Sequence, residues 1–270
     1  MKPTLKLKLL ILSAILLLQP CCTQVAITGR KQLNLVPDSV MNSMSFQSYG
    51  EFLSQNKLSN NAAQTQMVKS IGSRIQKAVE QYCSENNLSD QLKGYQWEFN
   101  LVEDKAVNAW CMPGGKVVVY TGLLPVAQTE AGLAVVMGHE IAHAIAKHGA
   151  ERMTQSLIVE MGGMALSQAL AKSPAQTKAL FTRSYGIGTE YGVLLPYSRV
   201  HESEADRMGL IFMAMAGYNP NEAVTFWERM AASKQGQAQT PEILSTHPAD
   251  STRIKNIKNL IPEAMKYYKH

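Results

Sequence analysis

The feature that most constrains this chain is one apolar stretch, residues 129–148, which reads TEAGLAVVMGHEIAHAIAKH. The stretch contains no proline and its apolar side chains recur at helical spacing, so we predict an amphipathic or fully buried helix. His139 and His143 stand four residues apart in it. On a helix this spacing puts both imidazoles on one face, where they can bind a single ion.

Glu140 follows the first histidine and points aside from the pair. From there its carboxylate can take a proton from a water and later give it to a leaving amine, which is the role of a general base. The pattern His139-Glu140-x-x-His143 is therefore typical of zinc metalloproteases. The alternative is a pair of core histidines without a metal, and a third ligand elsewhere in the chain would decide between the two.

A third ligand is expected on the helix that begins after Pro196 and carries several carboxylates. A catalytic zinc takes three protein ligands and keeps one position open. Glu202 and Asp206 lie four residues apart on one face, which favours Glu202 as the ligand and Asp206 as the acceptor for the second N–H of a ligand histidine. Glu204 points elsewhere, toward solvent or into a salt bridge. His201 is directed about a quarter turn or more from that face, so we do not expect it to bind the metal.

A small sheet is expected before the active helix. Residues 95–102 alternate in polarity, a short strand follows at 107–110, and 116–120 form a β-branched run. Pro and Gly at 113–115 indicate that one strand lies at a sheet edge, and an exposed edge can bind an extended peptide through main-chain hydrogen bonds. The residues expected at this substrate edge are Asn108, Ala109, Gly114 and Gly115.

The remaining elements divide the chain into an arm with a first helix, 21–60, and a zinc metallopeptidase domain, 61–270. Helices are predicted at 38–56, 61–86, 149–171, 221–233 and 248–261, an irregular arm at 25–37 and a mobile segment at 173–192. Cys83 and Cys111 could form a disulfide in an oxidising compartment or remain two buried thiols, and the sequence leaves both open.

The start of the chain is typical of an exported protein. Residues 1–20 carry a basic segment and the apolar run Leu9–Leu18, which together form an export signal too short to anchor the chain across a bilayer. Cys21 follows as in the lipobox of bacterial lipoproteins, although Pro20 replaces the usual small residue, so either lipid attachment at Cys21 or simple cleavage is expected. The predicted location is the periplasmic face of a bacterial envelope membrane, as an outer-membrane lipoprotein.

The charge of the chain excludes one class of partner. The formal net charge of +5 falls to +2 once the three lysines of residues 1–20 are removed. No basic tract remains to bind a polyanion, so a nucleic-acid partner is not expected.

Several motifs in one order give the chain a family resemblance. They are Asn108-Ala109, Pro113-Gly114-Gly115, Thr121-Gly122-Leu123-Leu124, His139-Glu140-x-x-His143, Ser198-Arg199-x-x-Glu202-x-x-Ala205-Asp206, and His247-Pro248 with Arg253. In these residues the sequence resembles the zinc metallopeptidase family that includes HtpX, the mitochondrial Oma protease and the CAAX prenyl proteases. The apolar spans of the integral-membrane branches are absent, so the similarity is to the exported branch of BepA and LoiP.

The resemblance implies an α+β fold, a mainly helical zincin (gluzincin-like) domain whose small sheet has an edge strand beside the active-site cleft. It also implies one Zn²⁺ per chain and places His247 and Arg253 in the cleft as donors that stabilise the oxyanion. From the residues alone, His247 and Arg253 could instead belong to a loop and the start of a helix. His247 could also occupy the open metal position and keep the enzyme latent.

The function predicted from these features is a zinc-dependent endopeptidase. It would hydrolyse unfolded or misfolded envelope proteins, next to the outer-membrane assembly machinery, from a lipid anchor. The alternative is a periplasmic chaperone or assembly factor with little cleavage. A zinc hydrolase of non-peptide amides is disfavoured, because the edge-strand features suit an extended chain.

Overall fold

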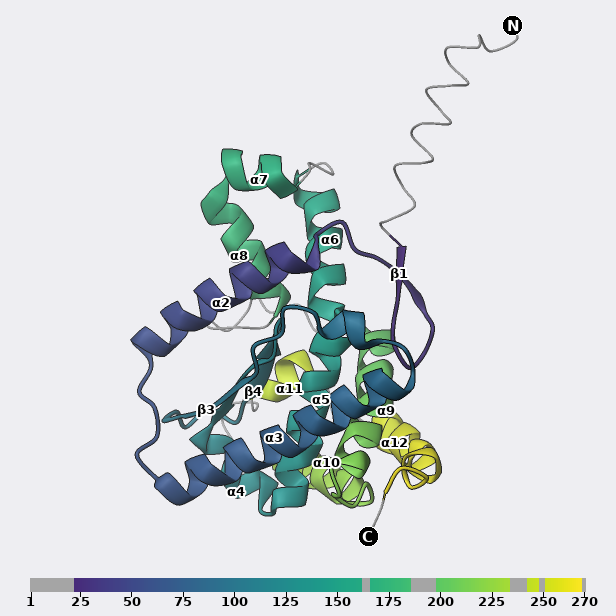
Figure 1. Cartoon of the computed structure of the whole chain (residues 1–270). Helices are drawn as coiled ribbons and strands as arrows, with labels where there is room; N and C mark the ends of the chain where they lie inside the picture. The colour runs from purple at the N-terminus through teal and green to yellow at the C-terminus, as the bar shows by residue number, and fades with distance from the viewer. Residues whose placement is uncertain (1–21, 162–165, 186–197, 234–241, 248–250, 269–270) are drawn as a thin grey trace, which may run out of the picture.

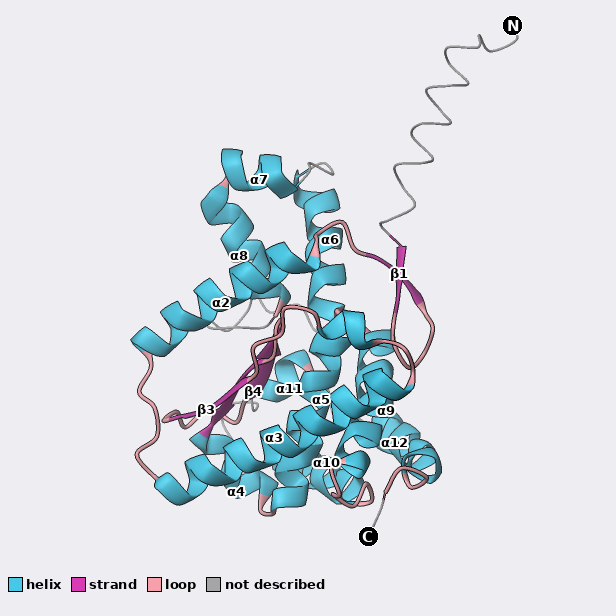
Figure 2. Ribbon diagram, viewed as in Figure 1, coloured by secondary structure: helices cyan, strands magenta, loops and turns pink. Residues whose placement is uncertain are grey.

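The computed structural model describes residues 22–161, 166–185, 198–233, 242–247 and 251–268. The predicted signal, Cys21, Pro248 and residues 186–192 of the segment expected to be mobile lie outside these ranges. The elements are β1 (Cys22–Gln24), β2 (Lys31–Leu33), α2 (Asp38–Gln55), α3 (Ala62–Glu85), η2 (Ser89–Leu92), β3 (Glu98–Val102), β4 (Ala109–Met112), β5 (Lys116–Tyr120), η3 (Thr121–Leu123), α4 (Leu124–Ala127), α5 (Glu130–Ile145), α6 (His148–Met161), α7 (Leu166–Lys172), α8 (Pro174–Ser184), α9 (Arg199–Met215), α10 (Glu222–Ser233), α11 (Glu242–Thr246) and α12 (Ser251–Ala264). Helices dominate and the strands are few (Figure 2), which confirms the predicted α+β, mainly helical class.

The sheet that flanks α5 has three strands in the order β3-β5-β4. β5 pairs in parallel with β3 and antiparallel with β4, and β4 packs against α5. Among the described strands β4 therefore forms one edge of the sheet, next to the active helix, as the sequence predicted.

Gly114 and Gly115 lie in the turn that joins β4 to β5, beyond the end of the edge strand. Both have positive φ, 76° and 83°. A Cβ on Gly114 would come within 2.5 Å of Phe46, and one on Gly115 within 2.6 Å of Trp97. Backbone conformation and packing thus account for both glycines, whereas Ala109 is the first residue of the edge strand itself.

Helix α5 is the centre of the fold. Thr129 caps it by accepting a hydrogen bond from Gly132 N, and the helix is buried from Gly132 to its end. Helix α9 packs along α5, and the two backbones meet at Gly138 and Gly209. A Cβ on Gly209 would lie 2.9 Å from the backbone nitrogen of His139, so the close approach of the helices requires glycine there.

Helix α5 ends before the predicted stretch does. Lys147 has φ of 58°, a left-handed conformation, and a new helix, α6, begins at His148. With α7 and α8, α6 extends away from the sheet at the top of Figure 1. Residues 174–184 of the segment expected to be mobile form helix α8, and Pro174 stands at its start, where proline favours helix.

The arm also differs from the prediction, because part of it is regular. β1 and β2 pair antiparallel as a short hairpin whose turn has Gly29 at φ of 68°. A two-stranded hairpin is marginal alone, so contacts of its side chains with α6 and α9, described below, hold it on the domain.

The described cysteines settle the question that the sequence left open. Cys83 on α3 and Cys111 on β4 are free thiols buried in one hydrophobic core. Burial raises the pKa of both, so they stay neutral and act as small apolar side chains.

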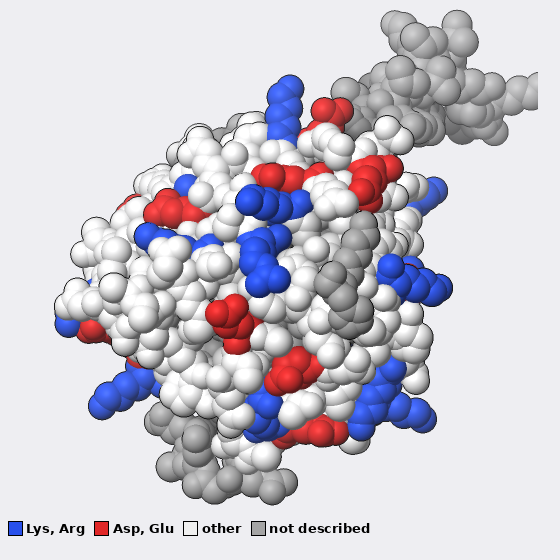
Figure 3. All heavy atoms as spheres, turned by 60° about the horizontal axis from the view of Figure 1, so that its bottom comes forward, with Lys and Arg blue, Asp and Glu red and all other residues white. Residues whose placement is uncertain are grey.

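Two further observations concern the helices and the surface. None of the described helices is both long and apolar enough to cross a bilayer. On the face drawn in Figure 3, basic and acidic side chains are interspersed with uncharged ones.

Candidate metal centre

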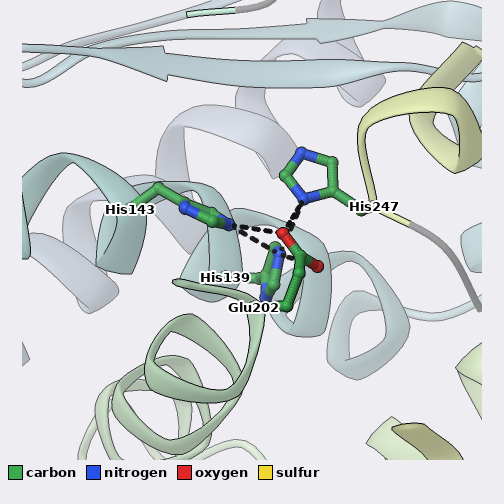
Figure 4. A group of neighbouring side chains, drawn as sticks. All are labelled: His139, His143, Glu202 and His247. Carbon is green, nitrogen blue, oxygen red and sulfur yellow. Dashed lines mark hydrogen bonds and ion pairs between the residues drawn. The ribbon is translucent and has the colours of Figure 1, made fainter. Parts of the chain in front are cut away.

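Four donor side chains converge beside α5. His139 and His143 come from α5, Glu202 from the first turn of α9, and His247 directly follows α11. All four are buried, and one ligand atom from each lies within 4.8 Å of the others. Figure 4 shows the imidazoles and the carboxylate pointing toward one another. We call this group the metal cluster.

The spacing of the metal cluster fits one four-coordinate ion. His143 Nε2 lies 3.1 Å from His139 Nε2 and 3.2 Å from Glu202 Oε1. His247 Nδ1 lies 2.8 Å from Glu202 Oε1 and 3.1 Å from His139 Nε2. Tetrahedral metal–donor bonds of zinc length would put such atoms about 3.3 Å apart. The three ligands predicted from the sequence therefore meet at one point, and His247 adds a fourth donor.

Charge also favours a cation at this point. Three carboxylates, Glu140, Glu202 and Asp206, gather around one guanidinium, that of Arg253, and all four groups are buried. When all are ionised the set carries two negative charges in excess, which a divalent ion neutralises.

Asp206 makes the contact expected of it. Its Oδ1 lies 3.0 Å from His139 Nδ1, the nitrogen that faces away from Glu202. A carboxylate at that nitrogen fixes the tautomer of a ligand histidine and raises its basicity.

Arg253 is in the site, and its guanidinium is held by carboxylates. Its Nε and Nη2 donate to Asp206 at 2.9 and 2.7 Å, and its Nη1 lies 3.0 Å from Glu202 Oε2. The guanidinium carbon lies 3.7 Å from the ring centre of Trp227, a residue that no sequence pattern had singled out. These contacts orient the two acidic side chains.

Glu140 has the surroundings of a general base. Its pKa is raised, chiefly by burial. Its Oε1 has no hydrogen-bond donor among the described residues, and His247 Nε2 stands 3.5 Å away. A buried carboxylate oxygen without a donor has capacity for one more proton-bearing partner, such as a water.

The ligand histidines differ in protonation without a metal. Burial lowers the pKa of His143 well below its usual value, so its imidazole is neutral and ready to bind an ion. Burial also lowers the pKa of His139, but Glu202 and Asp206 outweigh it and raise that pKa to about 9. A metal must therefore displace a proton from His139.

His201 and Glu204 have partners that exclude them as ligands. His201 Nε2 lies 3.0 Å from Glu151 Oε2. Glu204 is buried, not solvated, and forms a salt bridge with Arg30 at 2.8 Å. Sequence reasoning missed Arg30 and His148 here, and the only signal was a third histidine five residues after His143.

Comparisons with known proteins agree with this geometry. The sequence profile of Peptidase family M48 matches residues 70–261. The mitochondrial metalloendopeptidase OMA1 of Schizosaccharomyces pombe is 38% identical over 169 residues, which cover 63% of this chain and 48% of that protein. OMA1 of Arabidopsis thaliana is 37% identical over 198 residues, 72% of this chain and 38% of that protein.

A bacterial relative is less similar to this chain. The beta-barrel assembly-enhancing protease of Escherichia coli K12 is 30% identical over 170 residues, 60% of this chain and 34% of that protein. The matched regions span about half or less of the length of these relatives. The family match covers most of the chain and includes His139, His143, Glu202 and His247. The chain therefore belongs to peptidase family M48, whose members are metallopeptidases.

Proposed function

We propose that this protein is a zinc-dependent endopeptidase with His139, His143 and Glu202 as ligands and Glu140 as general base. The observation that carries the proposal is the convergence of these three donors beside a buried carboxylate whose Oε1 has no donor among the described residues. Nitrogen and carboxylate donors at tetrahedral spacing suit zinc.

A metal ion held by His139, His143 and Glu202 would supply a Lewis acid that polarises the scissile carbonyl. Glu140 takes a proton from the attacking water and gives it to the leaving amine, a role helped by the pKa that burial raises. Asp206 holds His139 in one tautomer. Arg253 keeps Asp206 and Glu202 in place, and we propose this orienting role for it rather than direct contact with the oxyanion.

His247 has two proposed roles. Its Nε2 is close enough to Glu140 to face the reacting carbonyl and stabilise the oxyanion. Its Nδ1 lies among the donor atoms, so the same side chain can complete the coordination and hold the enzyme latent. Movement of His247 away from the metal cluster would then switch the enzyme on.

The substrates we propose are unfolded or misfolded proteins of a bacterial envelope. Strand β4 forms a sheet edge beside α5, and only an extended segment can add to such an edge. The proposed location is the periplasmic face of the outer membrane, through an export signal at 1–20 and a lipid on Cys21. The name of the Escherichia coli relative supports a role near outer-membrane assembly, whereas other relatives are mitochondrial.

A second candidate, a chaperone or assembly factor with latent protease activity, follows from His247. A fourth protein ligand occupies the position that a water needs. Such a protein would hold an extended client without cutting it.

One experiment separates these functions. Bound zinc and casein cleavage are measured for the full chain, Glu140→Gln and His247→Ala. The endopeptidase proposal predicts one zinc for the parent and for Glu140→Gln, with cleavage only by the parent. Cleavage that appears only in His247→Ala supports latency. Cleavage by none of the three, with zinc bound, supports the chaperone.

A further inference from the structure

A second group of histidines and carboxylates lies next to the metal cluster and contacts it at His143. We define the arm cluster as Arg30, His148, Glu151, His201 and Glu204. His148 Nε2 lies 3.1 Å from Glu204 Oε2, and His201 Nε2 lies 3.0 Å from Glu151 Oε2. Arg30 bonds both carboxylates at 2.7–3.0 Å. The cluster joins the arm to α6 and α9.

The two clusters touch where the imidazole of His148 meets that of His143. His148 Nδ1 lies 2.9 Å from His143 Nδ1. His143 Nε2 faces His139 and Glu202 in the metal cluster. A nitrogen that binds a metal carries no proton, so the proton of His143 is on Nδ1.

This assignment fixes the direction of the next hydrogen bond. His143 Nδ1–H donates to His148 Nδ1, which must be the unprotonated nitrogen of its ring. His148 then carries its proton on Nε2 and donates it to Glu204 Oε2. The bonds thus run in one direction, from the ligand histidine to a carboxylate, through a second imidazole.

The second imidazole is held by stacking as well as by its two hydrogen bonds. His148 is fully buried, and its ring stacks on His201 with centres 4.4 Å apart. The left-handed turn at Lys147 returns the chain so that His148 faces α5. Glu204 is fixed in turn from the arm, by Arg30 and by the hydroxyl of Thr28.

We propose that His148 is a positioning residue for His143, and that the arm, through Arg30 and Glu204, sets its orientation. His148 keeps His143 in the tautomer whose Nε2 faces the metal. The arm, which lies far from the metal cluster in sequence, is then part of the support of the metal centre. This inference rests on the proposed zinc site.

Two conservative substitutions of His148 separate the two halves of its role. In His148→Asn the amide oxygen occupies the place of Nδ1 and can accept from His143, but the side chain does not reach Glu204. In His148→Gln the amide nitrogen occupies the place of Nε2 and can donate to Glu204, but no acceptor faces His143. Glutamine is also closer to histidine in size, so a packing role alone would favour it.

The measurement is the zinc dissociation constant by competition with a chelating dye, with the visible spectrum of the cobalt-substituted protein as a second readout. Supports of this kind change metal affinity by about 10–100-fold. We expect His148→Gln to bind zinc about 10–100-fold more weakly with an altered cobalt spectrum, and His148→Asn to stay within a few-fold of the parent. The kcat for casein cleavage should follow the same order while KM is unchanged.

Arg30→Gln tests the arm, with Lys258→Met as a control from an exposed ion pair. Arg30→Gln should weaken zinc binding several-fold, and Lys258→Met should not. The inference is overturned if His148→Gln binds zinc as the parent does, if His148→Asn is as weak as His148→Gln, or if Arg30→Gln binds as tightly as Lys258→Met. If the parent itself binds no zinc, the proposed function fails and the inference with it. Urea unfolding of each variant identifies any loss that comes from misfolding.

Discussion

The metal cluster and the arm cluster are both built of histidines and carboxylates and share helix α9, and they differ in where the positive charge lies. In the arm cluster the guanidinium of Arg30 bonds both Glu151 and Glu204. Beside the metal cluster Arg253 binds Asp206 and flanks Glu202, while within the cluster the donor atoms of three histidines and Glu202 face one another.

This difference shows how neighbouring groups of similar composition come to have different chemistry. In the arm cluster each carboxylate is bonded both by Arg30 and by a histidine, so both find their partners within the chain and the cluster serves packing and orientation. The arm cluster also keeps its carboxylates ionised. Burial alone would raise the pKa of Glu151 and Glu204, but hydrogen bonds from Arg30 and the histidines help lower both pKa values to about 2. Around the metal cluster the carboxylates of Glu140, Glu202 and Asp206 outnumber the one guanidinium of Arg253, so we expect an ion from outside the chain to complete the site.

Removal of the metal should distinguish the two clusters most strongly, because only the metal cluster is expected to bind an ion. Chelation should lower casein cleavage by about 10³-fold or more, since a metal contributes several kcal/mol to such a reaction. It should also lower the free energy of unfolding by about 4 kcal/mol relative to zinc at a thousand times its dissociation constant. Cleavage assays and urea unfolding with and without chelator check both values. Cleavage that persists at full rate in metal-free protein would contradict the account.

The close contact of α5 and α9 supports both clusters, so Gly209→Ala should disturb them together. The added Cβ would meet the backbone at His139 and should cost about 1–3 kcal/mol, with weaker zinc binding. Gly50→Ala on α2 is the control, because no atom lies within 4 Å of a Cβ there. It should be neutral or slightly stabilising. Equal effects of the two substitutions in urea unfolding would show that the helix contact tolerates a methyl group.

Substitution of Arg30 should destabilise the protein, because it removes the cation that the two carboxylates of the arm cluster share. Arg30→Met leaves Glu151 and Glu204 buried without their shared cation and should cost about 2 kcal/mol. Arg207 also binds a carboxylate with two nitrogens, that of Glu263, but this pair is more exposed. Arg207→Met should therefore cost less than about 1 kcal/mol. The two free energies of unfolding compare a buried with an exposed pair of the same chemistry, and a smaller loss for Arg30→Met would be inconsistent with the account.

Local spacing made the metal cluster predictable. His139 with His143, and Glu202 with Asp206, are pairs four residues apart, and the helix geometry that aligns them depends on nearby residues alone. His247 was reached through a family resemblance, because no periodicity joins it to the other donors.

The arm cluster could not be predicted in this way. Arg30 and Glu204 are 174 residues apart, and their contact depends on how the hairpin of the arm packs on α6 and α9. The sequence predicted either solvent exposure or a salt bridge for Glu204. Only the packed fold shows that this carboxylate is both buried and paired. The turn at Lys147 was also missed, since a left-handed lysine has no strong local signal, yet this turn brings His148 to His143.

The central claim is that the position of a carboxylate on α9 decides whether it binds the metal, and Glu202→Gln with Glu204→Gln tests it most directly. The two glutamates are two residues apart and both buried. At saturating zinc, elemental analysis should find one zinc per chain in the parent and in Glu204→Gln, and a large loss of zinc in Glu202→Gln. Full zinc content in Glu202→Gln, or the same loss in both variants, would contradict the account.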